Sequence, residues 1–247
     1  MEKRVKSIYY VGIEEEKRMP EKGKLSVYRQ VRTLPFEGGL LQIYFSFLPI
    51  QAVTPIEGHF FKRKRNLRMR QLQWNQLEEA ITFVQGLPKW DGEDDVIFSE
   101  RLQRELNRSQ DLPLELYAVC LKKVKTDKKS DLSTVSLSFP DDCGEITVEG
   151  VRRLLLPYLP RMNVVIYVGE ESEATRQLEV FLYEEYGILL SYEKKPHQDA
   201  VWIDLREKAG ESLNRYAIEN KIYHLNSAEV WKFLDTTVKN GYNTKVN

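Results

Sequence analysis

The segment from Asn163 to Val168 constrains the fold more than any other stretch of the sequence. After Asn163 it reads Val-Val-Ile-Tyr-Val, and an unbroken apolar run of this length is typical of a strand covered on both faces. Gly169 ends the run, Ser172 can cap a helix, and apolar residues at helical spacing continue to Gly187, which has the position of a helix stop. A buried strand that leads directly into a helix predicts a βαβ unit and a parallel sheet.

The rest of the C-terminal half repeats this alternation. The other predicted elements are a helix over 147–158 and strands over 188–192, 200–205 and 221–225. A last helix is predicted to begin with Ser227 as its cap. We therefore expect residues 111–247 to form an α/β domain with a Rossmann-like parallel sheet and helices on its faces.

Residues 114–139 fit two interpretations. Leu116, Val119, Cys120 and Val124 have helical spacing, whereas the β-branched content of the same stretch fits a strand. A charged turn and a strand-like segment over 132–139 follow. We favour a β-hairpin for this region.

The N-terminal part has a different pattern. Strands are predicted over 4–12, 25–32 and 40–48, with no helix between them, which favours a small antiparallel sheet. Helices are then expected from Asn66 to about Gly86 and from Ser99 to Asn107. These elements predict an α+β domain over residues 1–110, and the polar stretch 107–113 is the expected linker.

Composition narrows the class of protein. The 247 residues carry 37 basic and 37 acidic side chains, so the formal net charge of zero argues against a polycation that binds nucleic acid or membranes with its whole surface. The two cysteines, Cys120 and Cys143, form no CxxC motif and are expected to be buried, reduced thiols. The apolar stretch that begins at Ser7 is too short for a signal peptide, and the longest apolar run, 40–50, is too short to cross a membrane. We expect a cytoplasmic protein with no membrane contact.

A first candidate site lies where strand 163–168 meets the following helix. Ligands of α/β sheets bind at the carboxyl ends of the strands, and here Gly169, Glu170 and Ser172 occupy that position. Glu193 lies near the end of the next strand, where an acid that binds ribose would fall. However, a single glycine and several carboxylates suit a phosphate poorly, so a ligand-free crossover is favoured over a nucleotide or adenosyl site.

A second candidate is a basic segment without acids. It comprises Lys62, Arg63, Lys64, Arg65, Arg68 and Arg70. Cations near a helix N-terminus oppose the helix dipole, so local stability does not explain them. They predict either a patch that contacts phosphate or nucleic acid, or, as we favour, a solvated helix face.

Metal and catalytic signatures are weak. The three histidines, His59, His197 and His224, have no partner at metal-ligand spacing. A magnesium site formed by Asp141, Asp142 and Asp204 is an alternative to ordinary turn chemistry, which is favoured. The sequence contains no nucleophile elbow, P-loop, zinc-protease or kinase motif, so we assign no catalytic residue, metal or cofactor.

Three hypotheses for function follow. The favoured one is a non-catalytic module that binds a protein partner or forms a homo-oligomer. The second is a degenerate Rossmann-like enzyme or small-molecule binder that uses the site around Gly169. The third is nucleic-acid binding through residues 62–70. Whether the chain is an enzyme stays open at this point.

Overall fold

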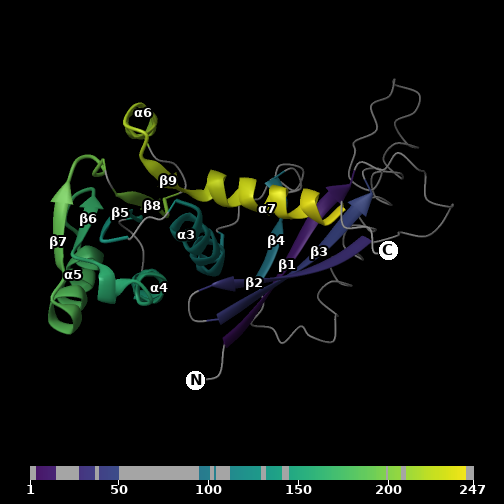
Figure 1. Ribbon diagram of the computed structural model, residues 1–247, viewed down its shortest axis with the longest axis horizontal. Coiled ribbons are helices and arrows are strands. Elements are labelled where there is room, and N and C mark those ends of the chain that lie inside the picture. Colours follow the sequence, from purple (N-terminus) through teal and green to yellow (C-terminus); the bar gives the residue numbers. More distant parts are fainter. Residues whose placement is uncertain are drawn as a thin grey trace, which may run out of the picture. The chain divides into compact units, whose positions relative to one another are not determined.

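The computed structural model describes four strands of the N-terminal part and most of the C-terminal half (Figure 1). The described residues are 4–14, 28–36, 39–49, 95–100, 103, 112–128, 132–140, 145–198, 200–206 and 210–242. The chain divides into two compact units, which are described separately. Unit 1 comprises Met1–Leu34 and Gly39–Asp111, and unit 2 comprises Pro35–Gly38 and Leu112–Asn247.

Unit 1 contains a four-stranded sheet. Its strands are β1 (Arg4–Glu14), β2 (Tyr28–Phe36), β3 (Gly39–Pro49) and β4 (Asp95–Phe98), in the order β2-β3-β1-β4. β1 pairs in parallel with both β3 and β4, so the prediction of an antiparallel sheet is wrong for these pairs. The short strand β4 was not predicted from the sequence at all.

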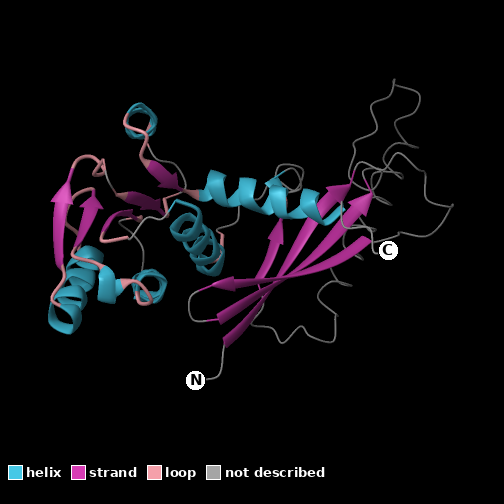
Figure 2. Ribbon diagram, in the orientation of Figure 1, coloured by secondary structure: helices cyan, strands magenta, loops and turns pink. Residues whose placement is uncertain are grey.

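The order of the strands explains the parallel pairing. β2 and β3 are separated by only two residues, and Figure 2 shows them running in opposite directions. Because β3 rather than β2 lies next to β1, the strand beside β1 runs in the same direction as β1. Residues 8–12 of β1 are buried on both faces, as expected for a central strand.

Unit 2 is a five-stranded sheet in which all strands are parallel, flanked by helices (Figure 2). Its strands are β5 (Thr134–Ser138), β6 (Val164–Val168), β7 (Leu189–Glu193), β8 (Val201–Asp204) and β9 (Tyr223–Leu225). Its helices are α3 (Leu114–Lys128), α4 (Glu145–Leu155), α5 (Glu173–Tyr186), α6 (Glu211–Glu219) and α7 (Ser227–Tyr242), with a 3-10 turn, η3, at Leu159–Arg161. The strand order is β7-β6-β5-β8-β9, so the predicted Rossmann-like parallel sheet is confirmed.

The predicted β-hairpin over 114–139 is wrong in its first half. Residues 114–128 form helix α3, and only β5 is a strand. Leu116, Cys120 and Val124 are buried at four-residue steps, so the helical spacing rather than the β-branched content decided the local structure. A helix before β5 also leaves β5 free to pair with β6 and β8 on its two sides.

Helix ends in unit 2 follow capping rules. Ser172 caps α5: its hydroxyl accepts from the Thr175 N–H, and the Thr175 hydroxyl accepts from the Ser172 N–H at 2.8 Å. Gly187 ends α5 with a φ of 67°, a left-handed conformation that favours glycine. The cap of α7 is Asn226 rather than the predicted Ser227, because the Asn226 Oδ1 accepts from the Glu229 N–H at 3.1 Å.

Several predicted elements lie outside the described residues. This applies to the helix over 66–86 and to most of the helix from Ser99 to Asn107, although the Gln103 N–H donates to the Ser99 carbonyl at 2.9 Å. Among the helices described, none is long and apolar enough to cross a membrane.

Candidate functional site at the carboxyl end of the parallel sheet

The strand order of unit 2 fixes where a ligand site would be expected. From the central strand β5 the chain proceeds to β6 and β7 on one side, and then returns to β8 and β9 on the other. The point where this direction reverses, between β5 and β8, is the topological switch point at which open α/β sheets usually bind ligands. Ser138 and Asp204 are register partners at the carboxyl ends of these two strands.

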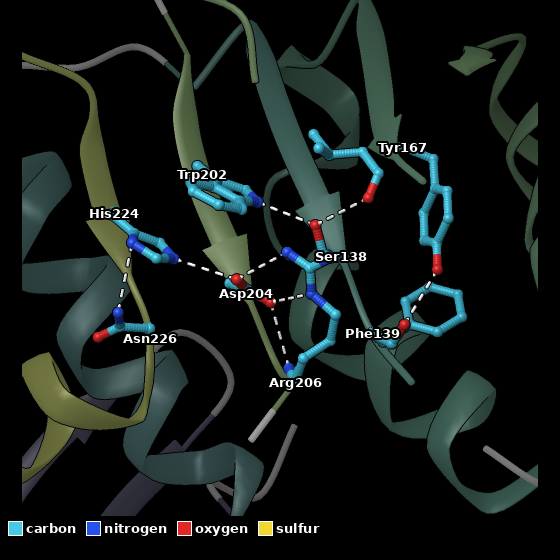
Figure 3. A network of polar contacts seen from close by, with 9 residues as sticks. Ser138, Phe139, Tyr167, Trp202, Asp204, Arg206, His224 and Asn226 are labelled. Carbon is cyan, nitrogen blue, oxygen red and sulfur yellow. Dashed lines mark hydrogen bonds and ion pairs between the residues drawn. The ribbon is translucent and has the colours of Figure 1, made fainter. Parts of the chain in front are cut away.

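Asp204 is the centre of a charged cluster at this point. Its side chain is fully buried. Arg206 Nε donates to Oδ1 at 2.7 Å and Arg206 Nη2 donates to Oδ2 at 2.9 Å, which is a bidentate pair, and the Arg206 backbone N–H donates to Oδ1 at 3.2 Å. The His224 Nε2 lies 3.2 Å from Oδ2. Figure 3 shows the three side chains pointing toward one another from β8, the segment after it, and β9.

The hydrogen bonds around His224 assign its tautomer. The Asn226 Oδ1 already accepts from the Glu229 N–H, so the group that Asn226 presents to His224 Nδ1, at 3.3 Å, is its amide nitrogen, a donor. Nδ1 therefore accepts, and Nε2 carries the proton and donates to Asp204. The ring also stacks on Trp202, with centroids 3.8 Å apart and planes 7° from parallel.

Ser138 continues this network toward β6. Its hydroxyl accepts from Trp202 Nε1 at 2.9 Å and donates to the Val168 carbonyl at 3.3 Å. At the end of β6, the Tyr167 hydroxyl donates to the Phe139 carbonyl at 3.0 Å. Polar contacts thus connect the carboxyl ends of four neighbouring strands, β6, β5, β8 and β9 (Figure 3).

Electrostatics at the site keep Asp204 ionised. Burial raises the pKa of its carboxyl, but the hydrogen bonds from His224 and Arg206, together with the charge of Arg206, outweigh burial and hold the pKa below its ordinary value. A buried carboxylate with a bidentate arginine is stabilised only as long as these partners remain.

The arrangement is ill-suited to proton transfer. An aspartate–histidine pair activates a nucleophile when the second ring nitrogen faces that nucleophile. Here the second nitrogen accepts from Asn226, and the nearby hydroxyl of Ser138 is bonded to Trp202 and Val168. Among the described residues, these contacts form a closed set of hydrogen bonds at the switch point.

The residues predicted as a ligand site lie one strand away from this cluster. Gly169 and Glu193 follow or end the adjacent strands β6 and β7, where the Gly169 N–H donates to the Glu193 carbonyl at 3.1 Å. Ser172 is engaged in capping α5, and the side chains of Glu170 and Glu193 are exposed. A Cβ on Gly169 would lie 2.7 Å from Cε1 of Tyr167, so packing alone requires glycine there.

Most of the other predicted candidates lie outside the residues that the structure describes. The basic segment Lys62–Arg70 lies outside the described residues, as do His59, Asp141 and Asp142. His197 is exposed, and its backbone N–H donates to the Ser136 hydroxyl at 3.0 Å. Within the described part of the chain, no group of three or more His, Cys, Asp or Glu side chains is arranged to hold a metal ion.

Comparisons with family models, with curated proteins and with solved structures found no match to this chain. The site is therefore defined by its geometry alone. Sequence analysis named Asp204 and His224 singly but missed their association with Arg206, Trp202 and Ser138. The available signal was a charged residue, Asp204, at the end of an otherwise apolar strand and followed two residues later by an arginine.

Proposed function

We propose that the chain is a non-catalytic module that binds a protein partner or forms an assembly. The observation that carries this proposal is the closed network at the switch point. The carboxylate of Asp204, both ring nitrogens of His224 and the hydroxyl of Ser138 all bond to groups of the same chain. A binding or catalytic pocket instead presents polar groups that converge on a ligand.

The aromatic and cationic side chains support the same conclusion. Trp202 is fully buried and is stacked against His224, while the guanidinium carbon of Arg206 lies 5.7 Å from the centroid of the Trp202 ring. Behind them, Trp202 packs with Val168, Ala217 and Ile222 in one apolar cluster. Side chains of the chain itself therefore cover the carboxyl end of β8.

The test is ligand-induced stabilisation of the full chain. Thermal unfolding should be measured with a panel of mononucleotides, dinucleotides and adenosyl compounds, because a ligand that binds only the folded state raises Tm. We expect no shift in Tm. A rise that is lost in His224→Gln but retained in the matched surface variant His197→Gln would contradict the proposal and assign a ligand to the switch point.

A second candidate is a small-molecule binder that uses this same end of the sheet. It is favoured by one specific observation: a charged cluster around a fully buried carboxylate lies at the switch point. That candidate requires Arg206 to exchange Asp204 for an anionic ligand, whereas the module proposed here does not. A cytoplasmic location stays a prediction from the sequence, which holds only two cysteines and no CxxC motif.

A further inference from the structure

Asn226 connects the His224 ring with the first turn of α7. Its Oδ1 caps the helix by accepting from the Glu229 N–H at 3.1 Å, and its amide nitrogen donates to His224 Nδ1 at 3.3 Å. The Asn226 carbonyl accepts from the Val230 N–H at 3.1 Å, which begins the helix. Figure 3 shows the amide of Asn226 beside the ring. One planar amide therefore serves both the ring and the helix cap.

A second proton on His224 is incompatible with this arrangement. Nε2 already carries the proton that is donated to Asp204, so a further proton can bind only at Nδ1. Protonated Nδ1 is a donor and cannot accept from the Asn226 amide nitrogen. If the amide turns by half a turn, its oxygen accepts from Nδ1, but its nitrogen then faces the Glu229 N–H, which is also a donor. One of the two hydrogen bonds of Asn226 is therefore lost when His224 is charged.

The helix cap is the hydrogen bond that is lost more easily. A hydrogen bond from a charged donor is roughly twice as strong as one between neutral groups. The His224 side chain is only 12% exposed, so water has little access to replace its partner. By contrast, the first turn of α7 lies at the surface, where Ala228 is exposed and water can accept from the released N–H. A cation near the positive end of the helix dipole also disfavours the capped turn.

The charged neighbours of His224 lie on several elements. Asp204 on β8 attracts a charged ring, and Arg206, which is paired with Asp204, repels it. The groups that α3 and α7 place against β9 line a hollow beside Tyr223, which points to the opposite face of the strand from His224. They are Cys120, Lys123, Glu229 and Lys232. On α6, Tyr216 packs against the Trp202 cluster, whereas Glu211, Arg215 and Glu219 are exposed.

We propose that His224 and Asn226 form a pH-sensitive switch that removes the N-terminal cap of α7 when His224 is protonated. Histidine is the side chain best suited to such a switch, because its charge ordinarily changes between about pH 5 and pH 8. Val230 and Leu234 are fully buried, so they hold the rest of α7 in place and confine the change to its first turn. The switch goes beyond the proposed function, since it requires neither a ligand nor a partner.

The test is a pH titration of the full chain by nuclear magnetic resonance between about pH 8 and pH 5. The Hε1 shift of His224 reports on the ring, and the amide shift of Glu229 reports on the cap. We expect both shifts to change with the same midpoint. Below that midpoint, the hydrogen-exchange protection factor of the Glu229 amide should fall about fivefold, which corresponds to the loss of one helix cap.

Three variants separate the steps. His224→Gln cannot be protonated, so the pH response of the Glu229 amide should disappear. In Asn226→Asp, one carboxylate oxygen can cap α7 while the other accepts from protonated Nδ1, so the ring should titrate while Glu229 stays protected. The matched control is His197→Gln, because His197 is exposed and this variant should respond to pH like the wild type.

Three outcomes would overturn the inference. The first is a Glu229 amide that stays protected while the His224 ring titrates in the wild type. The second is a His224 ring that does not titrate before the chain unfolds in acid. The third is a pH response of Glu229 that persists in His224→Gln. The first two outcomes are measured on the wild type, so the inference can fail even if a variant does not fold.

Discussion

The carboxyl end of the parallel sheet and the outer surface of helices α4 and α5 differ in which side chains they bury and which they expose. At the carboxyl end, charged and polar groups such as Asp204 and Ser138 are fully buried, and they are bonded to groups of the same chain. On the outer surface of α5, the apolar side chains of Val180 and Tyr183 are more than half exposed. In the part of the chain that the structure describes, the first region uses its polar groups in contacts within the chain, whereas the second exposes apolar surface.

This comparison shows why fold alone is a poor guide to the site. The strand order places the expected ligand site between β5 and β8, and the chain fills that position with a self-contained network. A buried polar group that lacks a hydrogen-bond partner destabilises the folded state. The network therefore stabilises the fold only when all of its hydrogen bonds are made. Binding capacity then has to come from another surface.

The largest effect is expected when the network loses its central carboxylate. Asp204→Ala leaves Arg206 and His224 without their shared partner, and removing one member of a buried ion pair costs about 3 kcal/mol. Urea unfolding followed by circular dichroism measures this loss. The matched variant on the exposed face, Val180→Asp, should change the free energy of unfolding by less than about 0.5 kcal/mol. Equal losses in the two variants would remove the distinction between the regions.

The contribution of Asp204 should also depend on pH. Because the folded-state pKa of Asp204 lies below its ordinary value, the stability that it provides is fully present above about pH 4 and is lost as the pH falls toward the folded-state pKa. The difference in unfolding free energy between wild type and Asp204→Asn should therefore be constant near neutrality and should narrow below about pH 4. A difference that widens in acid would mean that the pKa is raised instead.

A smaller effect is expected at Gly169. An added Cβ would press on the ring of Tyr167, which cannot easily move because its hydroxyl bonds to the Phe139 carbonyl and its ring packs against Phe139 at 5.0 Å between centroids. Overpacking of this kind costs about 1–3 kcal/mol, so Gly169→Ala should lower the midpoint of urea unfolding. In Gly187→Ala, where nothing lies within 4 Å of the added atom, only the left-handed backbone should be strained, at about 1 kcal/mol. An unchanged midpoint of urea unfolding in Gly169→Ala would show that packing does not constrain Gly169.

The smallest effect concerns Cys120 in α3. Burial raises the pKa of its thiol to about 12, and the nearby charge of Lys123 lowers it by less. The reactive thiolate is therefore scarce at neutral pH. In a Cys143→Ser background, Cys120 should not react with a thiol reagent in the folded chain and should react fully in denaturant. Rapid labelling of the folded chain would show that α3 opens.

Local sequence patterns predicted much of unit 2. The apolar run that forms β6, the cap at Ser172 and the stop at Gly187 are all as expected, because each depends on contacts within a few residues. The error over α3 arose where helical spacing and β-branched content pointed to different structures. Parallel pairing of β1 with β3 was missed because it depends on which strand lies next to β1, and no local pattern encodes that order.

The network at the switch point could not be predicted for the same reason. Ser138 and Trp202 are 64 residues apart in the sequence, and Asp204 and His224 are 20 residues apart. Their association follows from the placement of β8 beside β5 and of β9 beside β8. The predicted site around Gly169 lies at the carboxyl end of the sheet, and it stays a prediction. The position of the switch point between β5 and β8 depends on the strand order, which no local pattern encodes.

Hydrogen exchange of the full chain, with and without nucleotides, tests the central claim most directly because it reports on both regions at once. We predict that amides at 138–140, 201–206 and 222–226 keep the same exchange rates when nucleotides are added. Amides over 150–156 and 176–186, which report on α4 and α5, serve as the reference. Nucleotide-dependent protection that appears at the carboxyl end of the sheet and not over α4 and α5 would contradict the account.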